Sequence, residues 1–367
     1  MVDATEAWLY VGTQRSGPGT GISRARFDAR TGTLSPFAIA AVTDDPAFFV
    51  VDETRGRIVT CHSGTPGGVG AFQIDLVTGT LTPLERAASV GRGPSQLTLD
   101  HTSRFVLSAN YGGGYVDVHA LDAAGIGART SHVPHTGRGP DATRQTQPHV
   151  HCVRMSPDNR FALVADLGLD RVFVYRFDAA AGTLTPHDPA FAATAPASGP
   201  RHLAWHPNGR WVYLIEELSN TITTFAWDAA RGRLDAQQTI GTLPTAFSGD
   251  NTAAEILVRE DGRFLYTSNR GHDSLAIFAI DAGRGLLTLV SHEPSRGRTP
   301  RYMMFDPSAD WLFVSNVDSD SVALFRVDRS SGRLMPHGDL HPINRPHGLA
   351  WAPVRAAVRG LPSAGER

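Results

Sequence analysis

A chain of 367 residues is long enough for two or three ordinary domains, and its 41% of apolar residues can supply a substantial core. The formal net charge of −2 provides no overall basic field that would attract nucleic acid or an anionic membrane surface. Two cysteines, Cys61 and Cys152, are too few for a disulfide scaffold and lack the spacing of metal ligands.

Residues 1–6 contain no basic stretch followed by an apolar one, so the sequence predicts no secretion signal. No apolar run approaches the length of a membrane span. We therefore expect a cytoplasmic protein that binds neither membrane nor nucleic acid. For its assembly we expect a monomer or a weak homodimer.

One short phrase, Asp-x-x-x-Gly-x-Leu, recurs along the chain. An Asp side chain can bond its own backbone in a turn, and Gly adopts a positive φ without steric cost. Each copy therefore predicts a hairpin whose Leu opens the second strand. The six copies are Asp28-Gly32-Leu34, Asp75-Gly79-Leu81, Asp178-Gly182-Leu184, Asp228-Gly232-Leu234, Asp281-Gly285-Leu287 and Asp328-Gly332-Leu334.

A degenerate seventh copy is expected near Asp122, where Gly125 and Gly127 follow. A period of roughly fifty residues with strand patterns throughout is typical of a stacked or circular β array. Upstream of each turn, an apolar strand usually opens with Pro, and a second strand ends in small polar residues. The first strands are expected near Pro46, Pro94, Pro148, Pro200, Thr252, Pro300 and Pro346.

The two ends of the chain complement each other. Pro346 to Pro353 forms a first strand with no strands after it, and Trp8 to Ala40 has the later strands of a unit but no first one. Pairing the two would close a ring and remove its exposed sheet edges. The sequence thus predicts an all-β, seven-bladed propeller of four-stranded blades. It would form a single domain over residues 1–356, followed by a disordered tail at 357–367.

The topology predicts where a site would lie. The first two strands of a blade are antiparallel, so the start of the first and the end of the second meet at one mouth of the central channel. Polar residues gather at both places, and together they favour a small anionic ligand. Strand starts carry His149, His151, Arg201, His202, Arg301, Tyr302 and His347; strand ends carry His62, Asn110, Tyr111, Asp166, Glu216, Glu217, Asn269, Arg270 and Asn316.

A long insertion, Ser131 to Gln147, leads directly into His149 and is rich in Gly, Pro and Thr. Loops of that length are usually functional or disordered. We expect it to fold over the channel mouth as a rim.

At these residues the chain resembles the lactonase family of seven-bladed propellers, which includes bacterial 6-phosphogluconolactonases and fungal 3-carboxy-cis,cis-muconate cyclases. The resemblance covers nearly the whole chain and depends on the order and spacing of several short motifs. The motifs are His135-Thr136-Gly137-Arg138-Gly139-Pro140, Arg144-Gln145, Pro148-His149-Val150-His151 with Ser156-Pro157-Asp158, Gly199-Pro200-Arg201-His202-Leu203, Glu216-Glu217-Leu218, Ser268-Asn269-Arg270 and Thr299-Pro300-Arg301. Glu216 stands where the family usually has Asn.

The resemblance implies that His151, Arg201, Glu217 and Arg270 form the centre of the site, with His149, His202 and Arg301 around them. Lactone opening needs a proton acceptor near the carbonyl and positive charge for the developing oxyanion. His151 or Glu217 would accept the proton, with Arg201 as the third catalytic group. An Arg bidentate to Glu217 would keep that carboxylate ionised. His149, His202, Arg270, Arg301, Asn110, Tyr111 and His347 are the expected substrate-binding residues.

Other kinds of site fit less well. His149 and His151, two apart on a strand, could chelate Zn²⁺ together with Glu217. However, three arginines nearby would repel a cation, and the resemblance implies neither metal nor cofactor. Ser-His-Asp catalysis lacks its Gly-x-Ser-x-Gly elbow.

The leading hypothesis is hydrolysis of 6-phospho-D-glucono-1,5-lactone, a step of the pentose phosphate pathway. The rivals are a muconate-type lactonizing cyclase, hydrolysis of an unphosphorylated sugar lactone, and a non-catalytic interaction scaffold. A purely structural alternative is that the histidines and arginines only bond backbone at the blade starts. All six tryptophans lie in strand patterns, which favours core packing over an exposed binding surface.

Overall fold

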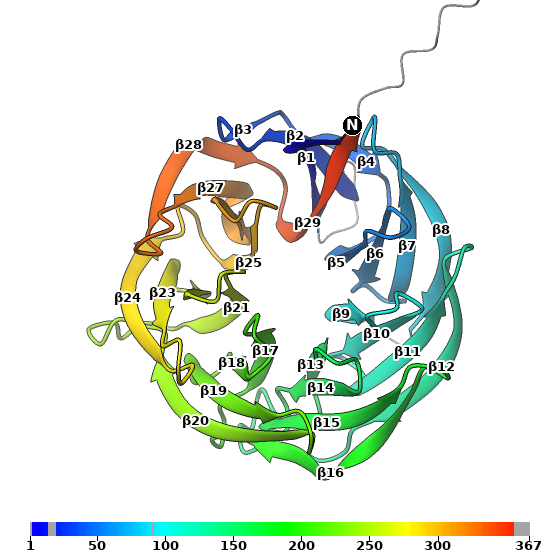
Figure 1. Cartoon of the computed structure of the whole chain (residues 1–367), viewed down its shortest axis with the longest axis vertical. Coiled ribbons are helices and arrows are strands. Elements are labelled where there is room, and N and C mark those ends of the chain that lie inside the picture. The colour runs from blue at the N-terminus through cyan, green and yellow to red at the C-terminus, as the bar shows by residue number, and fades with distance from the viewer. Residues whose placement is uncertain (1, 14–19, 90–91, 356–367) are drawn as a thin grey trace, which may run out of the picture.

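The computed structural model describes residues 2–13, 20–89 and 92–355. Over these residues the chain forms a ring of seven antiparallel sheets around a central channel (Figure 1). The first strand of each sheet lies next to the channel and the last at the outer edge (Figure 1). The predicted seven-bladed propeller is confirmed. We number the blades 1 to 7 in the chain order of their innermost strands.

The strands of blades 1 to 3 occupy the first half of the chain. Blade 1 contains β5 (Pro46–Asp52), β6 (Arg57–His62), β7 (Gly68–Ile74) and β8 (Leu81–Ala88). Blade 2 contains β9 (Gln96–Leu99), β10 (Phe105–Asn110), β11 (Tyr115–Leu121) and β12 (Ile126–Pro134). Blade 3 contains β13 (Val150–Met155), β14 (Phe161–Asp166), β15 (Arg171–Asp178) and β16 (Thr183–Ala193).

Three further blades follow the same order. Blade 4 contains β17 (Pro200–Trp205), β18 (Trp211–Glu216), β19 (Thr221–Asp228) and β20 (Arg233–Gly241). Blade 5 contains β21 (Thr252–Val258), β22 (Phe264–Arg270), β23 (Ser274–Ile280) and β24 (Leu287–Pro294). Blade 6 contains β25 (Pro300–Phe305), β26 (Trp311–Asn316), the 3-10 helix η1 (Val317–Ser319), β27 (Ser321–Val327) and β28 (Leu334–Pro342).

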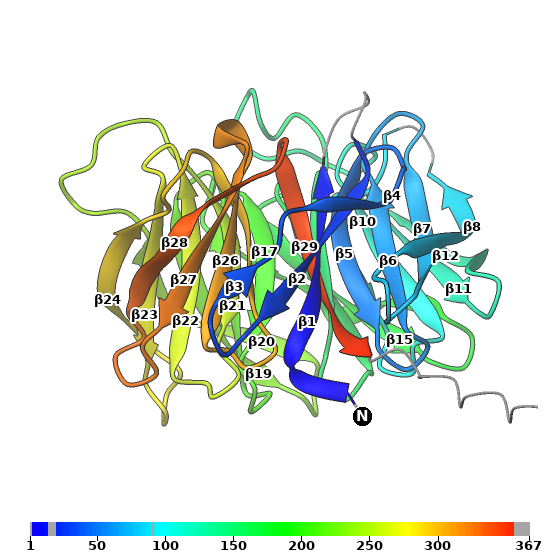
Figure 2. The same cartoon turned by 90° about the horizontal axis from the view of Figure 1, so that it is seen from above.

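Blade 7 is built from both parts of the chain that the sequence left incomplete. Its strands are β29 (Pro346–Arg355), β1 (Val2–Thr13), β2 (Ile22–Asp28), β3 (Thr33–Leu34) and β4 (Ala38–Ala41). β29 pairs antiparallel with β1, so that Trp8 faces Ala352 and Val11 faces Leu349 (Figure 2). This pairing closes the ring as predicted. The expected tail at 357–367 lies outside the described residues.

The glycine of the repeated turn motif has two roles: it closes the hairpin and it makes room for a side chain of the neighbouring blade. Gly285 adopts φ +72° and donates its N–H to the carbonyl of Asp281 at 2.7 Å, as the turn requires. A Cβ at Gly285 would also lie 2.3 Å from the ring of Trp211, which begins the second strand of the preceding blade. The glycine therefore lets an aromatic side chain of the neighbouring blade pack directly on the turn backbone. The degenerate seventh turn lies where expected, with Asp122 donating its N–H to Gly125.

Two first strands begin two residues later than predicted, at Gln96 and Val150. In blade 3 the backbone N–H of His149 bonds the side chain of Asp166 at 2.8 Å, which takes it out of the strand ladder. The other five first strands begin at the predicted residues.

A β-bulge near the start of several innermost strands decides which side chains face the channel. In blade 4, Pro200 pairs with Glu216 and His202 with Ile215, so Arg201 has no partner of its own. The same shift occurs at Arg301 in blade 6 and His151 in blade 3. A bulge turns two consecutive side chains towards the same side of a sheet. Arg201 and His202 can therefore both line the channel, as can Arg301 and Tyr302.

No helix within the described ranges has both the length and the apolar character that a membrane crossing requires.

Candidate functional site

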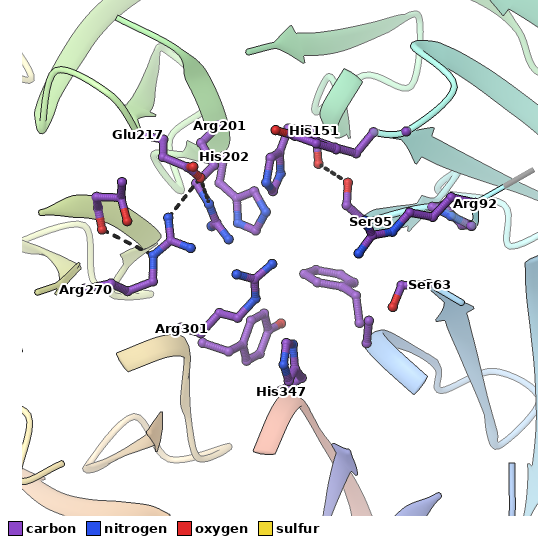
Figure 3. Close-up of a pocket in the computed structure, with 18 of the residues that line it drawn as sticks. Ser63, Arg92, Ser95, His151, Arg201, His202, Glu217, Arg270, Arg301 and His347 are labelled. Atoms are coloured by element: carbon purple, nitrogen blue, oxygen red, sulfur yellow. Dashed lines mark hydrogen bonds and ion pairs between the residues drawn. The ribbon is translucent and has the colours of Figure 1, made fainter. Parts of the chain in front are cut away.

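A cavity of about 330 Å³ opens at the channel mouth where the innermost strands begin (Figure 3). It brings together most of the predicted site residues. These are Tyr111, His151, Arg201, His202, Glu217, Arg270, Arg301 and His347, joined by Ala47, Phe48, Ser63, Arg92, Gly93, Pro94, Ser95, Gly112, Arg144, Thr252 and Tyr302.

Glu217 is the single carboxylate among the described residues that line this cavity. Its Oε2 accepts the Nε–H of Arg201 at 2.9 Å and lies 2.9 Å from Nη2 of Arg270. Its Oε1 accepts Nη2–H of Arg144 at 2.5 Å. The predicted bidentate arginine is thus replaced by three arginines that each contact one carboxylate oxygen.

This arrangement keeps Glu217 ionised. Burial alone would raise its pKa, but the charges of Arg270 and Arg201 outweigh burial and hold that pKa well below the usual range. Burial lowers the pKa of Arg201 to about 10, so Arg201 remains charged at neutral pH. Arg201 also donates to the carbonyl of Ala254, and Arg270 to those of Thr252 and Ala253. Arg201 and Arg270 thus bond backbone, as the purely structural alternative supposed, but both also line the pocket.

Arg301 and Arg92 occupy other parts of the wall. No carboxylate in the described ranges forms an ion pair with either of them. Burial, together with Arg270 and Arg201, lowers the pKa of Arg301 to about 9, which leaves it cationic at neutral pH. In Figure 3, Arg92, Ser95 and Ser63 lie across the pocket from Glu217.

The pocket histidines are neutral. Burial and neighbouring arginines hold the pKa values of His151 and His347 well below the ordinary value. Within the described residues, Nδ1 of His151 has no hydrogen-bond partner. The ring of His151 packs edge-on to Tyr111 and His202, at centroid distances of 5.4 and 5.1 Å.

Two predicted substrate-binding residues do not line the cavity. Asn110 is fully buried, donates to the carbonyl of Ser108 in its own strand at 3.3 Å and accepts from Ser89, which follows blade 1, at 3.3 Å. The prediction that Asn110 contacts substrate is therefore not supported by its position. His149 stacks on Tyr111 at a ring distance of 4.3 Å, behind the wall. Consecutive side chains at the end of a second strand point in alternate directions. The last residue of the strand therefore points into the blade, as in Asn110, Glu216 and Asn269. Its neighbour faces the pocket, as in Tyr111, Glu217 and Arg270.

Glu216, the departure from the family pattern, accepts the hydroxyls of Thr221 and Thr223 at 2.7 and 3.0 Å. Burial raises the pKa of this carboxyl. Glu216 therefore belongs to the interior of blade 4, although it is next to Glu217 in sequence.

The insertion is shorter than predicted, because Ser131–Pro134 belongs to β12, where His132 pairs with Asp117. The remaining loop is held by buried contacts. Gln145 donates to the carbonyl of Leu167 and to Asp170 at 2.8 and 2.7 Å. His135 bonds Asp166 at 2.6 Å and Tyr175 at 2.8 Å. The loop thereby carries Arg144 to the pocket wall.

The sequence patterns did not identify Arg92, Arg144, Ser63, Ser95 and Phe48 as lining residues, nor Glu255, which lies behind the wall. Arg144 was part of a motif but had no assigned role, and Ser63 follows the end of a second strand as Glu217 does. Glu255 lies in the middle of β21, where Nδ1 of His202 is 2.9 Å from its Oε1. A buried carboxylate within an apolar strand was the signal that could have revealed it.

The described residues contain no group of three or more His, Cys, Asp or Glu side chains placed to hold a metal ion. His149 and His151, whose spacing suggested a zinc site, do not face the same space. His149 stacks on Tyr111 behind the wall, whereas His151 lines the pocket.

Comparison with known families agrees with this geometry. The family described as lactonase, 7-bladed beta-propeller, matches residues 8–351, almost the whole propeller. The chain belongs to this family. It is therefore a lactone-hydrolysing enzyme, and the resemblance inferred from the motifs is confirmed.

Individual relatives cover most of the chain. It is 33% identical over 327 residues to a 6-phosphogluconolactonase of Bacillus subtilis, covering 89% of this chain and 92% of that protein. A 6-phosphogluconolactonase of Pectobacterium carotovorum is 32% identical, covering 75% and 77% of the two chains. The solved structure of a periplasmic gluconolactonase from Pseudomonas aeruginosa superimposes with a TM-score of 0.90 at 31% identity, covering 95% of this chain and 100% of that one.

Proposed function

We propose that this lactonase opens 6-phospho-D-glucono-1,5-lactone to 6-phosphogluconate. The observation that carries the proposal is the charge of the pocket: five arginines and one carboxylate line it, so it attracts an anionic lactone. Relatives named 6-phosphogluconolactonase in two genera support the same substrate.

The two walls suggest how the substrate lies. Arg201 and Arg270 are fixed by Glu217, so they are suited to a lactone carbonyl whose oxygen becomes negative. Arg92 and Arg301 have no carboxylate partner in the described chain and are suited to the phosphate. Ser63 and Ser95 add hydroxyls on the side of the pocket where Arg92 lies (Figure 3). Tyr111 and His347 would contact the sugar between the two walls.

We assign His151 as the proton acceptor in preference to Glu217. Both oxygens of Glu217 accept from arginines, whereas Nδ1 of His151 has no hydrogen-bond partner within the described residues. His151 is neutral at ordinary pH and lines the pocket. Water would give a proton to His151 as its oxygen bonds the lactone carbonyl carbon, and Arg201 and Arg270 would stabilise the oxyanion.

Replacing Arg144 with Ala is expected to lower kcat about fivefold to tenfold while leaving the fold intact. Glu217 keeps two of its arginines, and Arg144 is 38% exposed, so solvent compensates part of the loss. Steady-state kinetics with a thermal melt measures both effects. Arg138→Ala, an exposed arginine of the same loop, is the control, and equal effects of both substitutions would remove Arg144 from the site.

The direct test is lactone opening by the purified protein with freshly generated 6-phosphogluconolactone, corrected for spontaneous opening. Unphosphorylated gluconolactone and 3-carboxy-cis,cis-muconate are assayed alongside. We expect acceleration of the phosphorylated lactone above all. Preference for unphosphorylated gluconolactone would favour the activity of the Pseudomonas relative, and turnover of the muconate would favour a cyclase. A folded protein inactive on all three would contradict the proposal.

A scaffold role is less well supported. The large hydrophobic side chains that the described part of the protein exposes are mainly aliphatic. They belong to five different blades, so they do not form one binding surface. A cytoplasmic location and a monomeric or weakly dimeric state stay predictions, as does the absence of a cofactor. The Pseudomonas relative is periplasmic, so the compartment needs its own measurement.

A further inference from the structure

A second acidic group, unused by the mechanism above, lies behind the pocket wall against His202. Glu255 is 1% exposed, and its Oε1 accepts the backbone N–H of Ile256 at 3.0 Å and lies 2.9 Å from Nδ1 of His202. In the described structure, neither Oε2 of Glu255 nor Nε2 of His202 has a hydrogen-bond partner. A buried polar atom without a partner is costly, which favours a role for both atoms.

His202 connects this buried carboxyl to the substrate space. His202 lines the cavity, whereas Glu255 does not. Figure 3 shows the His202 ring between Arg201 and His151, directed towards the pocket. Phe48 packs edge-on against the His202 ring at a centroid distance of 6.1 Å, and Glu255 itself is almost fully buried. A proton that leaves Glu255 for the pocket therefore has His202 as its path.

We propose that Glu255 is a positioning residue that acts through His202, passing a proton to Nδ1 while Nε2–H of His202 protonates the leaving ring oxygen of the lactone. This inference rests on the lactone hydrolysis proposed above.

The step balances. After His151 has taken a proton from the attacking water, the tetrahedral intermediate expels the ring oxygen by breaking its bond to the carbonyl carbon. That oxygen takes the proton from Nε2 of His202, and Nδ1 receives the proton of Glu255. Glu255 ends as a carboxylate that accepts from Nδ1–H. His151 releases its proton to water in the pocket. Nε2 of His202 takes up a proton from the pocket as Nδ1 returns its own to Glu255, which restores the starting state.

The surroundings allow Glu255 to hold a proton near neutral pH. Burial raises the pKa of Glu255 to about 7, against the opposing charge of Arg201 and the N–H of Ile256. Burial and nearby arginines hold the pKa of His202 well below its ordinary value, so the ring stays neutral and only its tautomer changes. The titratable and charged groups that influence the pair from the surrounding strands are His151, Cys152, Arg154, Arg201, Glu217, Arg301 and Tyr302.

The sign of the pH dependence follows from this assignment. Below about pH 7 Glu255 is protonated and donates to Nδ1, which leaves the hydrogen on Nε2 ready for transfer. Above that pH the carboxylate accepts from Nδ1–H, and Nε2 carries only a lone pair. We therefore expect kcat to fall as pH rises through the pKa of Glu255, after correction for spontaneous opening.

The test compares Glu255→Gln with two other variants. E255Q should lower kcat about tenfold to a hundredfold and leave KM within about twofold. Its kcat should no longer decrease as the pH rises through the pKa of Glu255. E255D keeps a titrating carboxyl and should retain the fall at a reduced kcat. E216Q is the matched control, since Glu216 is also buried with a raised pKa but faces the blade interior. A wild-type pH profile and kcat in E255Q would overturn the proposal.

A second measurement uses the wild-type protein alone, without variants and without substrate. Nitrogen-15 NMR of His202 in the wild-type protein should show its proton moving from Nε2 to Nδ1 between pH 6 and 8, with the ring neutral throughout. A tautomer that stays fixed over this range would overturn the relay. If the wild-type enzyme opens no lactone, the proposed function itself fails. An active enzyme with unchanged E255Q kinetics contradicts the relay alone.

Discussion

Replacing Glu217 with Gln is expected to lower kcat/KM about a hundredfold to a thousandfold, because the two arginines meant for the oxyanion lose the carboxylate that aligns them. The same substitution leaves three guanidinium groups without their shared counter-charge. Loss of one partner from a buried ion pair costs about 3 kcal/mol or more of folding free energy. Kinetics with 6-phosphogluconolactone and urea unfolding would measure the two losses separately.

The control for this variant is E216Q, which changes the preceding buried carboxyl without touching the arginines. A Glu217→Asp variant that recovered part of the stability but little of the rate would indicate that alignment matters beyond charge. Full activity in E217Q would remove Glu217 from the mechanism. The pKa of Glu217 in the folded protein lies well below the usual range. Its contribution to the free energy of unfolding should therefore be fully present at pH values above its unfolded-state pKa, and should be lost only as the pH falls towards the folded-state pKa.

Arg301→Ala is expected to raise KM for the phosphorylated lactone about tenfold to a hundredfold, the loss of one hydrogen-bonded contact between charged groups. Arg301 is cationic, partly buried and unpaired with any carboxylate of the described chain, so its charge is available to the ligand. The effect on kcat should be smaller, since the phosphate is remote from the reacting carbonyl. For unphosphorylated gluconolactone, KM should change little.

Arg298→Ala provides the matched control, because this exposed arginine three residues earlier bonds the carbonyl of Asp318 and does not line the pocket. A pure loss of kcat in Arg301→Ala would place this arginine at the carbonyl instead of the phosphate. An equal loss of affinity for both lactones would move the phosphate to Arg92 or elsewhere.

The propeller was predictable because its repeat encodes local structure. Asp281 and Gly285 define a turn by their own backbone preferences, and the same phrase at a regular spacing repeats the hairpin around the ring. What the phrase does not reveal is the contact between Gly285 and Trp211. That contact joins residues 74 positions apart in two blades, and no local pattern encodes it.

The pocket was predicted in part, for a physical reason. Strand ends mark where the channel opens, which located Glu217 and Arg270 correctly at its wall. The direction of a side chain depends on alternation and on bulges, which the sequence does not display, so Asn110 was misplaced. Arg144 was not predicted as a site residue because it reaches the site from a folded loop. Glu255 was not predicted because it lies in the middle of a strand.

The pairing of β29 with β1 makes the enzyme's maturation an all-or-none event. β29 follows every other strand in chain order and carries His347 into the pocket. Six blades can form while the chain is still being synthesised, yet the channel mouth is incomplete until β29 emerges and docks. Until then the growing protein would expose one open sheet edge, at β1, and the apolar side chains of blade 6 that pack against β29, such as Trp311 and Phe313. A ribosome that stalls before Pro346 would therefore release a nearly complete protein that is inactive and prone to aggregate.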